Sequence, residues 1–237
     1  MRLFHFVAGM LVSAVAVTGT ASNFEPGSDQ LQIQKAVETP ACHERLANIG
    51  RSVTIPPPAE PTNCAVADLV RLEHVKMVDQ TTVTISPPAI LRCEAAEVFA
   101  QFIRNDLGPA AAQEFAAPLV GLSGTGSFEC RTRNRITPAK PSEHAKGNAI
   151  DIRTMILQNG ILINLPDHRT PKPFREKTRT LACSRFTTVL GPGSDTFHND
   201  HIHLDVLERP RGYRICQWDV TDQPVASVEI PLPRPKP

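Results

Sequence analysis

The sequence lacks several patterns that would place it in common classes of protein. No two of its cysteines form a C-x-x-C pair, which argues against a cysteine zinc finger and against a thioredoxin-type redox motif. It has no long basic run and a formal net charge of only +1, so it lacks the concentrated positive charge that binds the phosphates of nucleic acid. It also lacks the H-E-x-x-H segment of a zincin protease. A function must therefore be sought in other local clusters of side chains.

The N-terminus has the pattern of a secretory signal peptide. Arg2 precedes a mostly apolar run over residues 3–17, and small residues follow at 19–21, so we expect cleavage after Ala21. The run is shorter than the roughly 20 apolar residues that span a bilayer. Since no second apolar segment follows, no stable membrane insertion is expected after cleavage; an uncleaved anchor is the alternative. We predict an exported protein.

The cysteines fit an exported protein, because an even number in an oxidising compartment indicates disulfide bonds. There are six after the predicted signal peptide: Cys42, Cys64, Cys93, Cys130, Cys183 and Cys216. We predict that neighbours in the chain are joined, which would close three successive loops: Cys42 with Cys64, Cys93 with Cys130, and Cys183 with Cys216. Bonded sulfurs are not expected to act as nucleophiles.

Composition divides the rest of the chain into one domain with two extensions. Residues 22–41 are polar, and the segment 219–237 is rich in proline, so both are predicted to be extended. The part between them, residues 42–218, is long enough to fill one core. We predict a single domain there.

The domain mixes helical and strand patterns. Apolar residues at intervals of three and four predict a helix over 90–115, interrupted at Gly108-Pro109. A second helix is predicted over 175–186, because Pro173 lies just before it and no glycine or proline occurs within it. Three apolar-rich runs have the composition of strands: 119–122, 149–157 and 201–207. The mixture indicates an α+β fold, with a small antiparallel sheet that carries the functional residues and with flanking helices.

Two short segments concentrate imidazole and carboxylate groups. The first runs over residues 142–151, and the second, residues 198–203, reads His-Asn-Asp-His-Ile-His. Two histidines and one aspartate form the ligand set of an open catalytic zinc site, in which a fourth position is left for water. Zinc lowers the pKa of bound water to near neutrality and polarises a carbonyl. The segments therefore predict a metallohydrolase that acts on an amide, although the ligand set does not exclude an ester.

The predicted strand at 201–207 gives the second segment a geometry. Residues two apart in a strand face the same way, so His201 and His203 project together while Ile202 and Leu204 face the core. One imidazole can then bind the metal, and the other can stand beside the bound water.

The first segment needs a turn to bring its side chains together. His144 and Asp151 are seven residues apart and do not fit one helical turn. A loop that turns at Gly147 and enters a strand at Ala149 would bring both to one ion. We expect small residues at 147 and 149 because the backbone must pass close to the metal.

These motifs resemble those of a known superfamily. The pattern Ser-x-His-x-x-Gly-x-Ala-x-Asp at 142–151, followed by His-x-His at 201–203, is similar to the zinc peptidases of the lysostaphin, D-Ala-D-Ala metallopeptidase and hedgehog superfamily. Four segments closely resemble bacterial extensin-like C-terminal domain proteins: residues 128–131, 190–194, 198–205 and 214–216. The resemblance covers roughly residues 40–218.

The resemblance implies a role for each residue of the motifs. It implies that three residues bind one catalytic Zn²⁺: His144, Asp151 and His203. His201 would be the general base or would stabilise the tetrahedral intermediate. His198 and Asp200 match a His and an Asp of penicillin-insensitive murein endopeptidases, and D-Ala-D-Ala dipeptidases have a glutamate at the position of Asp200. Because Asp is shorter than Glu, we expect His201 to be the base and Asp200 to orient an imidazole.

Two further residues are candidates for the substrate side of the site. Arg131 stands where relatives carry an arginine that contacts a substrate carboxylate or carbonyl, a task that suits a guanidinium. The alternative is a solvated arginine beside Arg133 and Arg135. Ser142 is expected to bond the backbone around His144, and nothing around it would make it a nucleophile.

The resemblance thus implies a periplasmic zinc metallopeptidase, secreted across the inner membrane, that hydrolyses an amide in the stem peptides of peptidoglycan. An endopeptidase acting on cross-links is favoured over a D,D-carboxypeptidase. The second hypothesis is a non-catalytic module that binds the cell wall or a protein and contains zinc, because in the hedgehog branch an intact zinc site does not guarantee turnover.

Overall fold

The computed structural model describes residues 41–56, 64 and 66–221. The predicted signal peptide, nearly all of the polar extension at 22–41 and the end of the proline-rich segment lie outside the described residues. Within the described ranges, no helix combines the length and the apolar character that crossing a bilayer requires.

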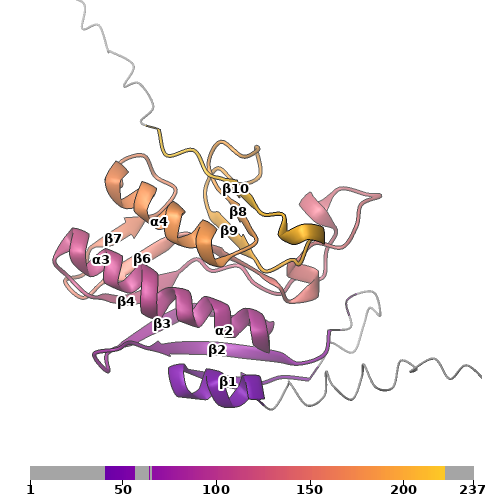
Figure 1. Ribbon diagram of the computed structural model, residues 1–237, viewed down its shortest axis with the longest axis horizontal. Coiled ribbons are helices and arrows are strands. Elements are labelled where there is room, and N and C mark those ends of the chain that lie inside the picture. Colours follow the sequence, from indigo (N-terminus) through magenta and orange to yellow (C-terminus); the bar gives the residue numbers. More distant parts are fainter. Residues whose placement is uncertain (1–40, 57–63, 65, 222–237) are drawn as a thin grey trace, which may run out of the picture. The chain divides into compact units, whose positions relative to one another are not determined.

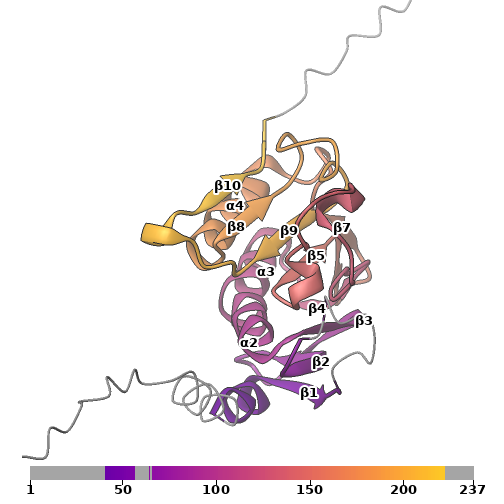
Figure 2. The ribbon, with the colours of Figure 1, turned by 90° about the vertical axis from the view of Figure 1, so that its right-hand side faces the viewer.

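Two β-sheets form the framework of the domain (Figures 1 and 2). The larger sheet has the order β1-β2-β3-β4-β6-β7, with β1 (Gly50–Thr54), β2 (Leu69–Lys76), β3 (Thr82–Arg92), β4 (Leu119–Ser123), β6 (Thr154–Leu157) and β7 (Leu162–Asn164). The smaller sheet has the order β10-β8-β9-β5, with β5 (Ala149–Ile152), β8 (Thr188–Leu190), β9 (Ile202–Asp205) and β10 (Ile215–Gln217). Strands pair antiparallel, except for β3 with β4 and β10 with β8.

Helices and short turns complete the domain. Residues 41–49 are helical. The other helical elements in the described part of the chain are α2 (Cys93–Phe102), the π-helix η2 (Ile103–Leu107), α3 (Gly108–Phe115), α4 (Lys172–Arg185) and the 3₁₀ turns η3 (Arg133–Arg135), η4 (His144–Lys146) and η5 (Pro210–Gly212). The predicted α+β class is confirmed. The small sheet is not purely antiparallel, however, because β10 runs parallel to β8.

The first predicted helix is shorter than expected. It begins at Cys93 rather than at residue 90, because Ile90 and Leu91 end strand β3, where Leu91 pairs with Val70. Both are apolar, so they fit the helical spacing as well as a buried strand. The expected interruption before Pro109 takes the form of the π-helix η2, in which the Gly108 N–H bonds Ile103 O.

The other predicted elements differ from the structure mainly at their ends. Helix α4 starts at Lys172, with Pro173 inside its first turn, where a missing N–H removes no helical hydrogen bond. The strand expected at 119–122 is β4. The run 149–157 forms two strands, β5 and β6, which belong to different sheets. The hairpin of β2 and β3 was not predicted.

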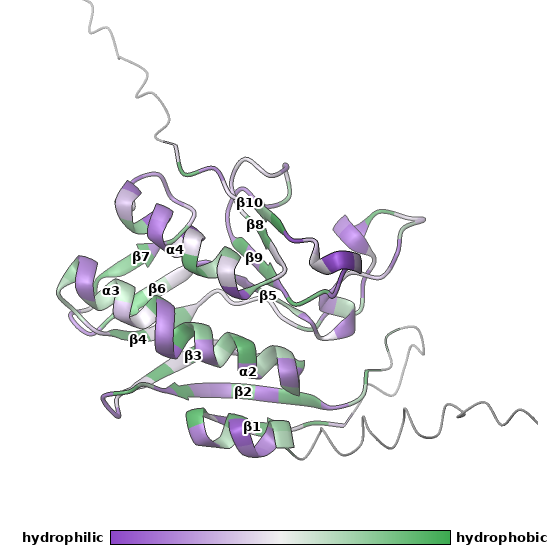
Figure 3. Ribbon diagram, viewed as in Figure 1, coloured by the Kyte–Doolittle hydropathy of each residue, from purple (hydrophilic) through white to green (hydrophobic). Residues whose placement is uncertain are grey.

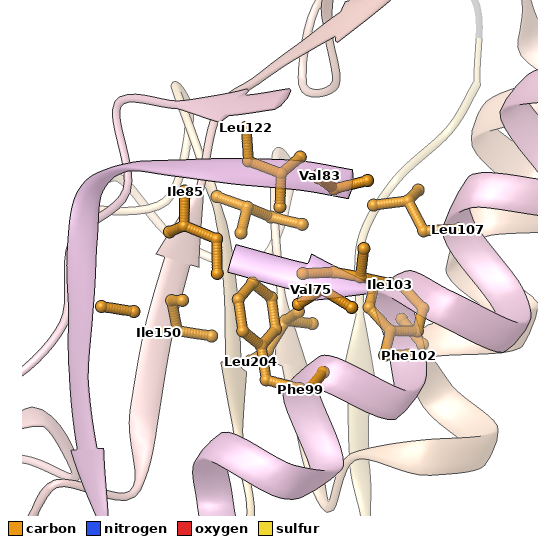
Figure 4. Packing of buried hydrophobic residues seen from close by; sticks show 14 of the residues in the cluster. Val75, Val83, Ile85, Phe99, Phe102, Ile103, Leu107, Leu122, Ile150 and Leu204 are labelled. Atoms are coloured by element: carbon orange, nitrogen blue, oxygen red, sulfur yellow. The ribbon is translucent and has the colours of Figure 1, made fainter. Parts of the chain in front are cut away.

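One hydrophobic core unites both sheets and the helices. Figure 4 shows Phe99 of α2 and Leu204 of β9 near the centre of this core, with Ile150 of β5 on one side of them and Ile103 of η2 on the other. Hydrophilic and hydrophobic positions alternate along α2 and α4, as expected for helices with one buried side (Figure 3). Because Ile150 and Leu204 face this core, their neighbours Asp151 and His203 project from the other face of the small sheet.

The disulfide pairing corrects the prediction at four cysteines. The structure joins Cys42 to Cys93, Cys64 to Cys130 and Cys183 to Cys216, and no cysteine is free among the described residues. The helical segment 41–49 packs into the core with the start of α2, which brings Cys42 to Cys93. Only the third pair joins neighbours in the chain.

Candidate metal site and its pocket

Strand pairing brings the two motifs together. In the register of β5 and β9, Asp151 lies directly opposite His203. His144 comes from η4, which ends at Gly147 and leads after two residues into β5. Three residues from separate parts of the chain therefore meet at one place on the small sheet.

Gly147 makes this turn, as predicted, but for a different reason. Its φ is +67°, the left-handed region that favours glycine. A Cβ atom there would lie 2.9 Å from Leu69 Cδ2 and 3.1 Å from the backbone N of Arg92. The small residue is therefore required by its backbone conformation and by contact with β2 and β3.

Three side-chain atoms converge at the meeting point. His144 Nε2 lies 3.2 Å from Asp151 Oδ1, His203 Nδ1 lies 3.0 Å from the same oxygen, and the two nitrogens are 3.1 Å apart. Two imidazole nitrogens and one carboxylate oxygen are the donors of an open catalytic site for zinc, and they also accept other divalent transition-metal ions. The set fits the metal that the sequence motifs imply.

A second group of potential ligands is unsuited to a metal. His43, Asp68 and Cys93 lie close together in the described part of the chain. The sulfur of Cys93 is bonded to Cys42, so it offers no thiolate.

Hydrogen bonds outside the triad orient both imidazoles. His144 Nδ1 lies 2.9 Å from Ser127 O, and because a carbonyl only accepts, this nitrogen carries the proton and Nε2 faces the triad. His203 Nε2 lies 3.2 Å from Asp205 Oδ2. Asp205 was not selected from the sequence, although the alternation 201, 203, 205 along a strand places it on the same face.

The charges within the triad are strongly coupled. Burial opposes ionisation of Asp151, but hydrogen bonds with His144 and His203 outweigh it and hold the pKa of Asp151 far below its usual range. Burial likewise opposes protonation of His203, yet the carboxylates of Asp151 and Asp205 raise the pKa of His203 to about 9. In the metal-free protein the site thus retains a proton where a metal cation would take its place.

His201 and Asp200 stand beside the triad. The side chain of His201 is 16% exposed, and its Nε2 lies 3.6 Å from Asp151 Oδ1, beyond hydrogen-bond distance. Its Nδ1 lies 2.8 Å from Asp200 Oδ1, and Arg153 Nη2 donates to the other oxygen of Asp200 at 2.8 Å. The hydrogen bond with His201 is the main cause of a lowered pKa of Asp200. Arg153 was not selected from the sequence.

His198 forms a second histidine–aspartate pair at the same place. Its Nδ1 lies 2.6 Å from Asp195 Oδ1, an oxygen that also accepts the backbone N–H groups of Phe197 and His198. Its ring centroid lies 5.3 Å from that of His201 and 5.6 Å from that of His203. Burial lowers the pKa of His198, and the bond to Asp195 only partly offsets this. Asp195, too, was not selected from the sequence.

The triad, His201 and His198 line a pocket of about 550 Å³, and Asp200 lies outside its wall. The pocket also includes the two substrate-side candidates, Arg131 and Ser142. Arg131 Nε donates to Glu129 at 2.9 Å, so this arginine is not simply solvated. Ser142 is buried, and its Oγ accepts a hydrogen bond from the N–H of Ala145. Ala145 belongs to η4, the turn that carries His144. The structure therefore brings the predicted ligands, both further histidines, Arg131 and Ser142 to one pocket, and Asp200 contacts it through His201.

Comparison with known proteins places this site in a family. A search among curated proteins and a search among solved structures gave no match. The model of a family described as "Extensin-like protein C-terminus" matches residues 40–217, a range that includes both motifs and nearly all of the predicted domain. On the strength of that match, the chain belongs to the extensin-like protein C-terminus family.

Proposed function

We propose that the protein is an exported, periplasmic zinc metallopeptidase that hydrolyses an amide bond in the peptide part of peptidoglycan. The observation that carries the proposal is the convergence of His144 Nε2, Asp151 Oδ1 and His203 Nδ1 in an open pocket, with His201 beside them. Three protein ligands with one open position are the arrangement of catalytic rather than structural zinc sites.

The residues of the pocket divide the chemistry between them. His144, Asp151 and His203 would hold the ion, which supplies Lewis-acid polarisation of the scissile carbonyl and activation of water when it is bound. His201 lies next to this position but outside the triad, so it is free to move a proton. It accepts the proton of the attacking water at Nε2 and delivers it to the leaving amine.

The two aspartates that pair with histidines assist this transfer. Asp200 accepts from His201 Nδ1 and so leaves Nε2 directed toward the triad. Asp195 holds His198 in the same way, which fixes a second ring in the pocket as a hydrogen-bonding group for the reacting carbonyl.

Arginines on the pocket wall support a peptide substrate that carries carboxylates. Arg131, Arg133 and Arg135 all line the pocket. A guanidinium recognises a carboxylate through two parallel hydrogen bonds. Stem peptides contain such carboxylates at D-alanine and meso-diaminopimelate residues, and the resemblance to murein endopeptidases favours cleavage of a cross-link.

Digestion of isolated peptidoglycan tests the proposal. The purified protein is incubated with peptidoglycan, with and without a chelator, beside His203→Ala, and released fragments are identified by mass spectrometry. We expect cross-linked dimers to become monomers in a reaction that the chelator and the substitution both abolish. Loss of only a terminal D-alanine would mean a carboxypeptidase. Bound zinc without any cleavage would favour the non-catalytic binding module.

A further inference from the structure

The metal-facing nitrogen of His203 depends on side chains behind it. We propose that a hydrogen-bonded chain of Arg209, Thr188 and Asp205 fixes the tautomer of His203, which makes these three residues positioning residues for the metal ligand. The inference rests on the proposed function, because it assumes that His203 binds a metal through Nδ1.

The chain is continuous through the small sheet. Arg209 Nη2 donates to Thr188 Oγ1 at 2.6 Å, and the hydroxyl of Thr188 is hydrogen-bonded to the carboxylate of Asp205. Asp205 Oδ2 in turn lies 3.2 Å from His203 Nε2. Thr188 and Asp205 lie directly opposite each other in the pairing of β8 and β9, and each is only 3% exposed. Water therefore has little access to the hydrogen bond between Thr188 and Asp205.

The chemistry of each group fixes the direction of every bond. A guanidinium can only donate, so the hydroxyl of Thr188 accepts from Arg209 and directs its single proton to Asp205. An ionised carboxylate can only accept, so the nitrogen of His203 that faces Asp205 must carry a proton. That nitrogen is Nε2. In the metal-free protein Nδ1 also carries a proton, which it donates to Asp151, and Nδ1 is the nitrogen that offers its lone pair once a metal displaces this proton.

The carboxylate itself is held on both oxygens. Asp205 Oδ1 accepts the N–H of Leu207 at 3.0 Å and the hydroxyl of Thr187 at 3.4 Å. With Oδ2 facing His203 and the hydroxyl of Thr188 bonded to the same carboxylate, the group cannot rotate without breaking bonds to buried donors. This rigidity explains why a short, buried aspartate can set the orientation of a ring.

His144 is fixed differently, and this makes His203 the testable ligand. Its outer nitrogen bonds the backbone carbonyl of Ser127, which no side-chain substitution removes. The outer nitrogen of His203 depends on Asp205, which can be changed without altering shape. The substitution Asp205→Asn introduces an amide N–H₂ that can donate to Nε2 and so favour the tautomer with a proton on Nδ1.

Zinc affinity and the tautomer of His203 are the two measurements. We expect Asp205→Asn to weaken zinc binding by about 10- to 100-fold in competition with a chelating dye. Thr188→Val, which keeps the shape of the side chain, should produce a smaller loss in the same direction. The matched control is Asp195→Asn, which makes the same change at His198 and should leave zinc affinity unaltered. Long-range ¹H–¹⁵N correlation of the zinc-loaded wild type should show His203 protonated at Nε2.

The outcomes separate this inference from the proposed function. If the wild type binds zinc but cleaves no peptidoglycan, the enzyme proposal fails. A loss of zinc affinity in Asp205→Asn but not in Asp195→Asn would still support the positioning role of Arg209, Thr188 and Asp205. If Asp205→Asn binds zinc as tightly as the wild type, or if His203 is protonated at Nδ1 in the loaded protein, the inference is overturned. Thermal unfolding of the metal-free variants shows whether a loss of affinity reflects a loss of fold, and an unfolded Asp205→Asn leaves Thr188→Val as the deciding variant.

Discussion

The identity of the general base can be decided by comparing His201→Ala with Asp200→Asn. In the structure His201 lines the pocket with its Nε2 3.6 Å from Asp151 Oδ1 without being part of the triad, and Asp200 reaches the triad only through His201. Removal of a general base costs about 10²- to 10⁴-fold in rate. We therefore expect His201→Ala to lower kcat by that factor while one zinc ion remains bound per chain.

The effect expected for Asp200→Asn is far smaller. The side chain of Asp200 is 67% exposed, so its ion pair with His201 is screened by water and contributes at most about 1 kcal/mol. That energy corresponds to about a fivefold change in rate. The larger loss of kcat is expected for His201→Ala because His201 is nearer to the triad and less exposed than Asp200. If Asp200 were the base instead, as the glutamate of D-Ala-D-Ala dipeptidases at its position suggests, Asp200→Asn would cause the larger loss.

Both variants are assayed for the rate of cross-link cleavage by mass spectrometry and for zinc content by elemental analysis. The matched control is His168→Ala, which removes an exposed imidazole outside the pocket and should change neither quantity. A loss of activity in Asp200→Asn that exceeds the loss in His201→Ala would refute the assignment of His201 as base. Loss of zinc from His201→Ala would show instead that His201 is a ligand.

Three further predictions concern the metal and the fold. Because the metal-free pKa of His203 is about 9, zinc must displace a proton below that pH, so zinc affinity measured by dye competition should rise up to about tenfold per pH unit toward pH 9; an affinity independent of pH would contradict this. Replacing Cys64 by serine should lower the free energy of unfolding by about 4 kcal/mol, because its bond to Cys130 closes a loop of sequence separation 66. Non-reducing peptide mapping of the wild-type protein should recover the pair of Cys64 and Cys130. Gly191→Ala should cost about 1–3 kcal/mol in urea unfolding, since its Cβ would lie 2.8 Å from two atoms of the buried ring of Trp218; an unchanged midpoint would refute the contact.

Local patterns in the sequence were sufficient to find the site residues. The two-residue period of a strand placed His201 and His203 on one face, and Ile202 and Leu204 are indeed buried on the other. The predicted ligands could be named because the motifs resemble those of a zinc peptidase superfamily, and the strand register places Asp151 opposite His203. Arg153 was missed because an isolated arginine carries no pattern that distinguishes it from a solvated charge, whereas Asp205 shares the two-residue period of His201 and His203 and could have been selected from it.

Long-range pairing could not be predicted from the same information. Ile90 and Leu91 satisfy both a helical spacing and a buried strand, and only pairing with β2 decides for the strand. The run 149–157 has the composition of one strand, but Arg153 separates a segment that pairs with β9 from one that pairs with β4. The disulfides depend on the same tertiary arrangement, since Cys42 meets Cys93 across 51 positions of sequence.

The register of β5 and β9 also limits how this family can change in length. Side chains alternate between the two faces of a sheet, so inserting or deleting one residue between Ala149 and Asp151 would turn the aspartate into the hydrophobic core. The connection from β6 to β7, residues 158–161, carries no such constraint, because it is exposed and holds none of the site residues. Related chains should therefore differ freely in the length of that connection, while the spacing within each of the two strands remains fixed.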